Sequence, residues 1–267
     1  MKRGGTTIFK KIIISGNYLE LFKFERGVKV GYTICNRKQT RRKKKKIEPK
    51  QLEIFNRQTF RIIKPEENEY SDEELKPRMS SYYRTKANIK RLAWSNADEF
   101  LVFLTLTFKD NIQDFGRANY ELKNFLKKLR RRYPDIKYLG ICEFQKRGAI
   151  HYHFLVNKFH DANDLAKMWK NGFIKINKLR NKSNLGNYIV KYLCKEIYLD
   201  NRFFNKRKVF YSRNLKKPVI TTDRYFIRDL LKNRFSENLS LEEKYRYDGV
   251  NEYTGKFNYV LYGLDYK

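Results

Sequence analysis

The order of apolar segments between residues 98 and 199 is the feature that most constrains the fold. Phe100–Phe108 (FLVFLTLTF) is apolar enough for a buried strand. Arg117–Arg132 repeats apolar residues at helical spacing, and Pro134 marks its end. Further strands are expected at 138–144, 149–156 and 173–179, and further helices at 161–170 and 185–198. This order predicts an α+β fold, with a central antiparallel sheet covered by helices.

Basic regions flank this core at both ends. We expect residues 1–97 to form a basic N-terminal region that contacts DNA, and residues 200–267 a basic, aromatic C-terminal extension. In the first region, Ile12–Phe24 and Val28–Cys35 suggest a hairpin turning near Arg26-Gly27, and Ser81–Trp94 has helical spacing. In the second region, Phe257–Leu264 is expected to be an edge strand.

The charge balance indicates a polyanionic partner. Sixty Lys and Arg residues against 29 Asp and Glu residues give a net charge of +31 among 267 residues. Such an excess would repel itself in a free globule, so nucleic acid is the first candidate partner and an anionic membrane the second. The run Arg41–Lys46 (RRKKKK) is expected to be a solvated loop that touches phosphate. Charge alone favours a structural RNA-binding protein at least as strongly as an enzyme.

Two classes of protein are excluded by the sequence. No run of 18 apolar residues occurs, so we expect no membrane-spanning segment. The three cysteines (Cys35, Cys142 and Cys194) have no C-x-x-C spacing, which excludes a zinc finger and favours a reducing cytoplasm.

A candidate metal site comes from Glu143 and the sequence His151-Tyr152-His153. Alternate residues of a strand share a face, so both imidazoles point the same way. A three-residue loop ending at a left-handed Gly148 would place Glu143 opposite His151 on that face. Two imidazoles and a carboxylate make a competent divalent-metal site. The alternative is a surface histidine pair on an edge strand, beside an ordinary exposed acid.

A second candidate site lies in the helix expected at 185–198. At 100° per residue, Tyr188, Lys191, Tyr192 and Lys195 fall within one arc of about 100°. The lysines would favour the phenolate form of a nucleophilic tyrosine and could hold a phosphate. The alternative is an amphipathic surface helix with half-buried tyrosines, because a pair at this spacing is weak evidence in a chain with 20 tyrosines.

Three motifs, taken in order, resemble those of the HUH endonucleases. The resemblance is to the rolling-circle replication initiators of phages and bacterial plasmids, and it covers roughly Ser95 to Glu196. The first motif resembles Phe103–Phe108, the second Glu143–His153, and the third the doubled Tyr-x-x-Lys from Tyr188 to Lys195.

The resemblance implies an Mg²⁺ or Mn²⁺ ion bound by His151, His153 and an acidic or amide ligand, for which Glu143 is the local candidate. It also implies a nucleophilic tyrosine that becomes joined to the 5′ phosphate of single-stranded DNA and leaves a free 3′ hydroxyl. In two-tyrosine relatives the pair alternates between initiation and termination; if only one is essential here, we favour Tyr192 over Tyr188.

The resemblance also suggests partners and a compartment. The partners are single-stranded DNA at a replication origin and, in the absence of a P-loop, a host helicase and polymerase in the cytoplasm of a bacterial host. Thr105 and Thr107 either support the site or are ordinary core-strand residues, and Tyr211–Pro218 (YSRNLKKP) resembles a stretch that often follows such a core. A relaxase, a single-tyrosine transposase and a non-enzymatic nucleic-acid-binding protein remain alternatives.

Overall fold

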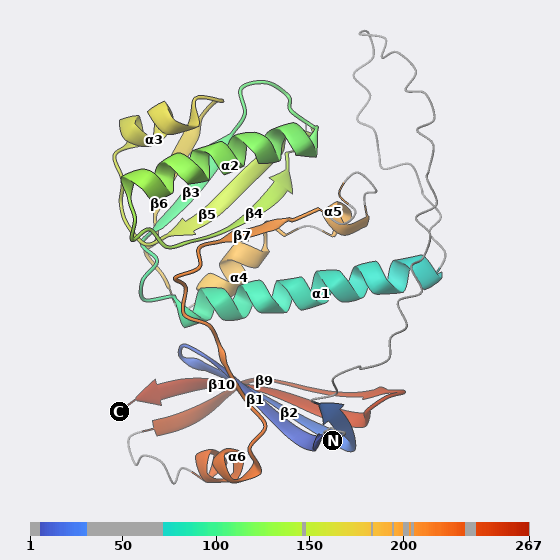
Figure 1. Ribbon diagram of the computed structural model, residues 1–267. Helices are drawn as coiled ribbons and strands as arrows, with labels where there is room; N and C mark the ends of the chain where they lie inside the picture. Colours follow the sequence, from blue (N-terminus) through green and yellow to red (C-terminus); the bar gives the residue numbers. More distant parts are fainter. Residues whose placement is uncertain are drawn as a thin grey trace, which may run out of the picture.

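Two antiparallel sheets lie on opposite sides of one long helix in the computed structural model of the chain (Figure 1). The structure describes residues 6–30, 72–145, 148–182, 184–193, 195–199, 203, 206–232 and 239–266. The predicted basic run Arg41–Lys46 lies outside these ranges, as do Cys35 and Cys194. Cys142 is buried and is a free thiol. None of the helices in the described ranges is long and apolar enough to cross a membrane.

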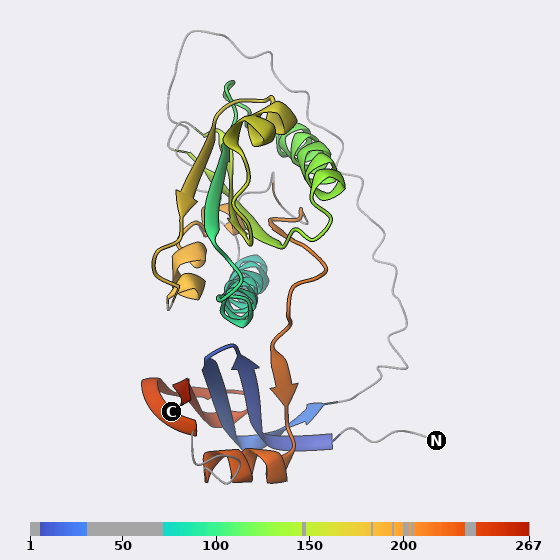
Figure 2. The same cartoon turned by 90° about the vertical axis from the view of Figure 1, so that its left-hand side faces the viewer.

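The central sheet has five strands in the order β6-β3-β5-β4-β7, and all its pairings are antiparallel. Helices α2 and α3 cover one face, while α4 and α1 lie on the other side (Figure 2). The predicted α+β fold with an antiparallel sheet and covering helices is thus confirmed. The bounds are β3 (Val102–Thr107), α2 (Phe115–Arg132), β4 (Tyr138–Phe144), β5 (Ile150–Val156), α3 (Ala162–Trp169), β6 (Ile174–Lys178), α4 (Leu185–Val190) and β7 (Val209–Tyr211).

Local signals in the sequence explain the bounds of these helices. Asp114 caps α2 by accepting a hydrogen bond from the Arg117 amide, and Asp161 caps α3 in the same way through the Asp164 amide. Helix α2 buries the predicted apolar stripe against the sheet, which fixes how it lies across the strands. The stripe comprises Leu122, Phe125, Leu126 and Leu129.

The terminal sheet combines strands from both ends of the chain, in the order β8-β1-β2-β10-β9. Helix α6 packs on one face of it, over an apolar cluster that includes Ile12, Leu21, Ile227 and Val260. The two basic flanking regions therefore pair with each other, which the sequence did not indicate. The bounds are β1 (Thr6–Ser15), β2 (Tyr18–Val30), β8 (Val219–Thr221), α6 (Arg224–Leu231), β9 (Leu239–Asn251) and β10 (Gly255–Tyr266).

Two predictions for the terminal sheet are wrong. The first hairpin turns at Gly16-Asn17 rather than at Arg26-Gly27, because Gly16 adopts a φ of 56° that suits a tight two-residue turn. Arg26 and Gly27 lie within β2. Strand β10 is an interior strand paired with both β2 and β9, so the expected edge strand at 257–264 is not at an edge.

Helix α1 (Asp72–Ser95) separates the two sheets (Figure 1). It extends the helix expected at 81–94 toward the N-terminus by more than two turns. Near its C-terminal end, the Trp94 ring stacks on Tyr18 of β2 at a centroid distance of 4.3 Å. The Arg91 guanidinium forms a largely buried ion pair with Glu20, also on β2. These contacts attach the terminal sheet to the helix.

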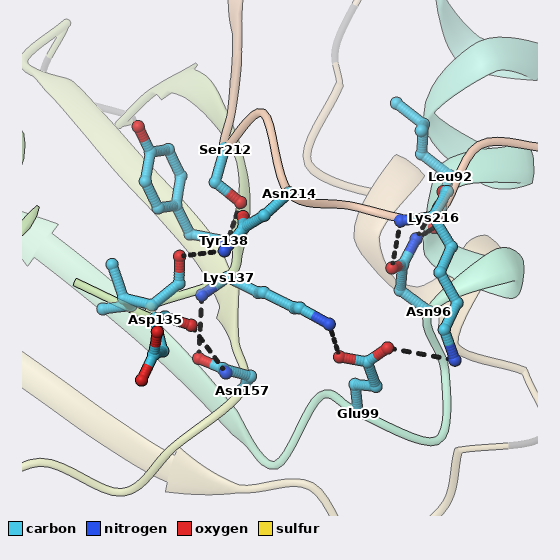
Figure 3. Close-up of polar contacts among 11 residues, drawn as sticks. Leu92, Asn96, Glu99, Asp135, Lys137, Tyr138, Asn157, Ser212, Asn214 and Lys216 are labelled. Carbon is cyan, nitrogen blue, oxygen red and sulfur yellow. Dashed lines mark hydrogen bonds and ion pairs between the residues drawn. The ribbon is translucent and has the colours of Figure 1, made fainter. Parts of the chain in front are cut away.

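The segment between β7 and β8 ties the central sheet to the end of α1 (Figure 3). The Ser212 amide donates to the Tyr138 carbonyl, and the Tyr138 amide donates to the Ser212 hydroxyl. Four residues later, the amide and carbonyl of Lys216 both bond to the side chain of buried Asn96. Glu99 accepts from the ammonium groups of Lys137 and Lys216. The stretch 211–218 that the sequence singled out is therefore a structural clasp.

Candidate active site

The hairpin of β4 and β5 has the register predicted from its turn. Glu143 pairs with His151, and the Gln145 amide donates to the Ala149 carbonyl at 2.8 Å. Gly148 has a φ of 83°, the left-handed conformation that the short loop requires. Glu143, His151 and His153 consequently lie on one face of the central sheet, whereas Tyr152 is buried on the opposite face against Phe108 and Phe210.

His153 is held on both sides by polar contacts. Its Nε2 lies 2.6 Å from a Glu143 carboxylate oxygen, and its Nδ1 lies 3.1 Å from the Thr105 hydroxyl. Both imidazoles are nearly buried, with exposed fractions of 7% for His151 and 6% for His153. Thr105 therefore orients one imidazole from the neighbouring strand β3, which decides between the two roles that the sequence left open for it. The side chain of Thr107, paired with His151 in the register, has no such printed contact with a histidine.

The three candidate ligands fit a divalent cation by donor type. Imidazole nitrogen and carboxylate oxygen are both accepted ligands for such ions, and all three side chains emerge from one hairpin face. No three His, Cys, Asp or Glu side chains in the described ranges form a ready-made cluster, however. Glu143 contacts His153 directly, and the two imidazole centroids are 6.2 Å apart. Binding an ion would replace the hydrogen bond between Glu143 and His153.

The two predicted tyrosines lie beside this hairpin. The Tyr192 ring centroid is 4.2 Å from that of His153, and the Tyr192 hydroxyl donates to the Tyr188 hydroxyl at 3.4 Å. Tyr188 lies within α4, whose apolar residues Ile189 and Val190 are buried in the main core. The structure thus brings both tyrosines next to the histidine face.

The helix expected to carry the tyrosines is broken, which corrects one prediction. Helix α4 ends at Val190, and α5 (Glu196–Leu199) is a separate short turn. The amides of Lys191, Tyr192 and Leu193 bond to carbonyls three residues earlier, so the chain tightens after α4. The break lets α5 turn back onto α1, where the Tyr198 ring contacts Tyr82 at 5.5 Å.

The electrostatics of the tyrosine pair also differ from the prediction. The pKa of Tyr192 is raised well above its usual value, first by burial, then by its hydrogen bond with Tyr188 and by the charges of Tyr188 and Glu143. Lys191 and Lys195 are exposed and are not among the causes of this shift. The expectation that these lysines lower the pKa of the nucleophile is therefore wrong for Tyr192.

Phe103 is a contributor to the site that the sequence reasoning did not assign. Its ring lies 5.5 Å from that of His153, 5.0 Å from Tyr188 and 5.1 Å from Tyr192. It shares the face of β3 with Thr105, two positions away, so strand alternation could have indicated it. His160, expected to be incidental, packs its ring against Tyr133 at 4.0 Å.

Comparisons with known proteins agree with a role in replication. Residues 101–197, which hold the hairpin and both tyrosines, match the model of a family of replication-associated proteins of the ORF2 type. This match supports a replication role and an interaction with DNA. Among solved structures, the chain is similar to the hypothetical protein ORF119 from Sulfolobus islandicus rod-shaped virus 1, at 18% identity over 40% of this chain and 91% of that one, with a TM-score of 0.28. The search of curated proteins gives no match.

Proposed function

We propose that the protein is a replication initiator that nicks and rejoins single-stranded origin DNA through a tyrosine, of the two-tyrosine HUH type. The observation that carries this proposal is the contact between the tyrosine pair and the histidine hairpin. Tyr192 lies 4.2 Å from His153 by ring centroids, and its hydroxyl contacts that of Tyr188. A nucleophile and a candidate metal-ligand set are thereby close enough to act on the same substrate phosphate.

The proposed reaction is a transesterification. The Tyr192 oxygen attacks the scissile phosphorus and forms a phosphotyrosine bond to the 5′ phosphate, while the bond from phosphorus to the 3′ oxygen breaks. The 3′ oxygen leaves as a hydroxyl, and the phenol proton is released to solvent. One phosphodiester is exchanged for another, so the reverse attack by a 3′ hydroxyl rejoins the strand without an energy source.

Each residue of the site has a defined task in this proposal. A Mg²⁺ or Mn²⁺ ion held by Glu143, His151 and His153 would polarise the scissile phosphate and stabilise its developing charge. Thr105 holds the His153 ring in place through Nδ1. Tyr188 orients the Tyr192 hydroxyl and is itself the second nucleophile. Lys191 and Lys195, both exposed, would contact DNA phosphates rather than activate a phenol.

The proposal is tested by trapping the covalent intermediate. The protein is incubated with single-stranded oligonucleotides from its own replicon and Mn²⁺, and the products are separated on a denaturing gel. We expect a protein–DNA adduct that disappears in EDTA and in the double variant Tyr188→Phe/Tyr192→Phe. Tyr211→Phe, a change at an exposed tyrosine of β7, is the matched control and should leave the adduct unchanged.

Two outcomes would reject this function. Tight DNA binding without cleavage of any origin oligonucleotide would favour the non-enzymatic nucleic-acid-binding protein. An adduct that persists in the double variant would move the nucleophile to another residue. A relaxase or transposase would share the adduct but not priming, so extension of the freed 3′ hydroxyl by a host polymerase with a host helicase separates the initiator from these alternatives.

A further inference from the structure

One face of the terminal sheet carries a continuous group of aromatic side chains. In the strand register, Phe24 pairs with Phe257, while Phe22 and Tyr247 both pair with Tyr259. Residues paired in this way point to the same side of a sheet. We call this side the aromatic face; its members are Phe22, Phe24, Tyr245, Tyr247, Phe257 and Tyr259.

The aromatic rings are close to one another yet partly open to solvent. The centroid distances are 5.0 Å from Phe22 to Tyr259, 6.2 Å from Tyr245 to Tyr259 and 5.8 Å from Tyr247 to Phe257. Tyr245 and Tyr247 remain 55% and 51% exposed. The core of the terminal sheet lies on the opposite side, beneath α6. An exposed aromatic group of this extent marks an interaction surface rather than a core.

Positive charge surrounds these rings. The Lys11 ammonium lies 5.6 Å from the centroid of Phe22. The Glu20 carboxylate on the same side is neutralised by Arg91 and accepts a hydrogen bond from Tyr259 at 3.1 Å. The pKa of Lys11 is lowered, first by burial and then by the charge of Arg91, which shows two cations crowded together. Such a surface favours an anionic partner with flat apolar groups.

Helix α1 runs along this side of the sheet. Its contacts step together with β2, because Trp94 meets Tyr18 and Arg91 meets Glu20 one strand repeat further on. Continuing in that direction leads along β2 toward Phe22 and along α1 toward Arg84. Arg84 is exposed and lies two helical turns before Arg91, on the same side of the helix. The rings are therefore bordered by further basic charge.

We propose that the aromatic face is a stacking platform for single-stranded DNA, bordered by α1. Unpaired bases would stack on the exposed rings while Lys11 and Arg84 contact the phosphates. The proposal extends the proposed function and rests on it for the choice of DNA as the strand. Helix α4 lies against α1, since a side chain at Gly186 would meet the Lys90 carbonyl at 3.0 Å. The platform and the tyrosine pair therefore flank one helix.

Alternative occupants fit these observations less well. A second copy of the chain would bring another charge of +31 to a basic surface, which opposes self-association. Duplex DNA offers phosphates but hides its base faces within the helical stack, so it cannot use the rings. A single strand satisfies the charge and the rings together.

The test measures binding without cleavage. The probe is a labelled oligothymidine of about 20 nucleotides, long enough to span the platform. The full chain is compared with the variant Tyr245→Leu/Tyr247→Leu by fluorescence anisotropy. We expect the affinity to fall by roughly tenfold or more, because each stacked base contributes substantially to binding. Tyr245→Phe/Tyr247→Phe should restore it, since phenylalanine keeps the aromatic ring.

The matched control is Tyr225→Leu on α6. Tyr225 is 54% exposed, as the platform tyrosines are, but its helix covers the opposite side of the same sheet. We expect this variant to bind the oligothymidine as the unmodified chain does. Thermal unfolding within a few degrees of the unmodified chain would show that each variant is folded.

Three results would overturn the platform. They are an unchanged affinity in the double-leucine variant, an equal loss in Tyr225→Leu, and equal competition by a duplex of the same length. Sedimentation showing a dimer that the leucine variant dissociates would likewise assign the face to a second copy. An adduct assay run in parallel separates the two proposals, because oligothymidine binding lost without loss of the adduct affects the platform alone. If no adduct forms with any variant, the proposed function fails while the binding comparison still decides the platform.

Discussion

Replacing Tyr192 with phenylalanine should abolish the first cut while leaving the fold intact. The change removes one hydroxyl, whose hydrogen bond to Tyr188 is long at 3.4 Å. Its loss should cost about 0.5 kcal/mol, at the low end for a neutral hydrogen bond. The phenylalanine ring keeps the packing on Phe103 at 5.1 Å and on His153 at 4.2 Å. The melting temperature should therefore shift by only about 1–2 °C.

The effect on the reaction should be far larger. Loss of an attacking residue lowers the rate by roughly 10⁴-fold or more, or about 5 kcal/mol of transition-state stabilisation. Tyr188→Phe should leave the first cut much closer to that of the unmodified protein. The reason is position, since the ring contacts of Tyr188 are with Phe103 and Tyr192, whereas Tyr192 also contacts the histidine ligand.

Single-turnover adduct formation on an origin oligonucleotide with Mn²⁺ measures this difference. The two single variants are compared on a denaturing gel, and their melting curves are recorded in parallel. Equal first-cut rates in the two variants would refute the argument from proximity to His153. A normal rate in Tyr192→Phe together with a lost rate in Tyr188→Phe would reverse the assignment of the nucleophile.

Four other substitutions test the site and its support. Thr105→Val keeps the side-chain shape but loses the bond to the histidine Nδ1, so Mn²⁺ affinity measured by calorimetry should fall roughly 10- to 100-fold. Asn96→Ala leaves backbone groups of the clasp without partners and should lower the free energy of unfolding by about 2–4 kcal/mol in urea titrations. Gly140→Ala would set a methyl group 2.1 Å from the Phe154 ring and should cost about 1–3 kcal/mol, partly recovered by adding Phe154→Leu. Glu99→Gln should cost about 1 kcal/mol at neutral pH, since hydrogen bonds from two lysines lower the pKa of this carboxyl. That stabilisation is present above the usual carboxyl pKa of 4.5 and is lost as the pH falls through the lowered pKa, so the unfolding curves of the two proteins should converge in acid; a difference that persists there would contradict the assignment.

The histidine hairpin was predictable because a short turn determines its geometry. One glycine with positive φ sets the register, and the register then decides which side chains share a face with His151 and His153. Helix caps at Asp114 and Asp161 were similarly local. In each case the residues that decide the structure lie within a few positions of one another.

The parts that could not be predicted depend on contacts between distant residues. The terminal sheet pairs β2 with β10, more than 200 positions later in the chain, and no local pattern encodes that partner. The periodicity of 185–198 predicted one helix, but packing of Tyr198 on Tyr82 of α1 favours a break after Val190. The raised pKa of Tyr192 follows from burial, which helical spacing does not report.

Helix α1 gives a physical reason for the two sheets to act on one DNA strand. Its last turns contact both sides, because Trp94 stacks on Tyr18 of the terminal sheet and lies close to Gly186 of α4. A Cβ at Gly186 would come within 2.7 Å of the Trp94 indole nitrogen, so α4 cannot move toward α1 without displacing this ring. The helix therefore sets the separation between the aromatic face and the tyrosine pair. A single strand that leaves the platform around the end of α1 would meet Tyr188 and Tyr192 after a path fixed by one helix diameter, on the order of 10 Å.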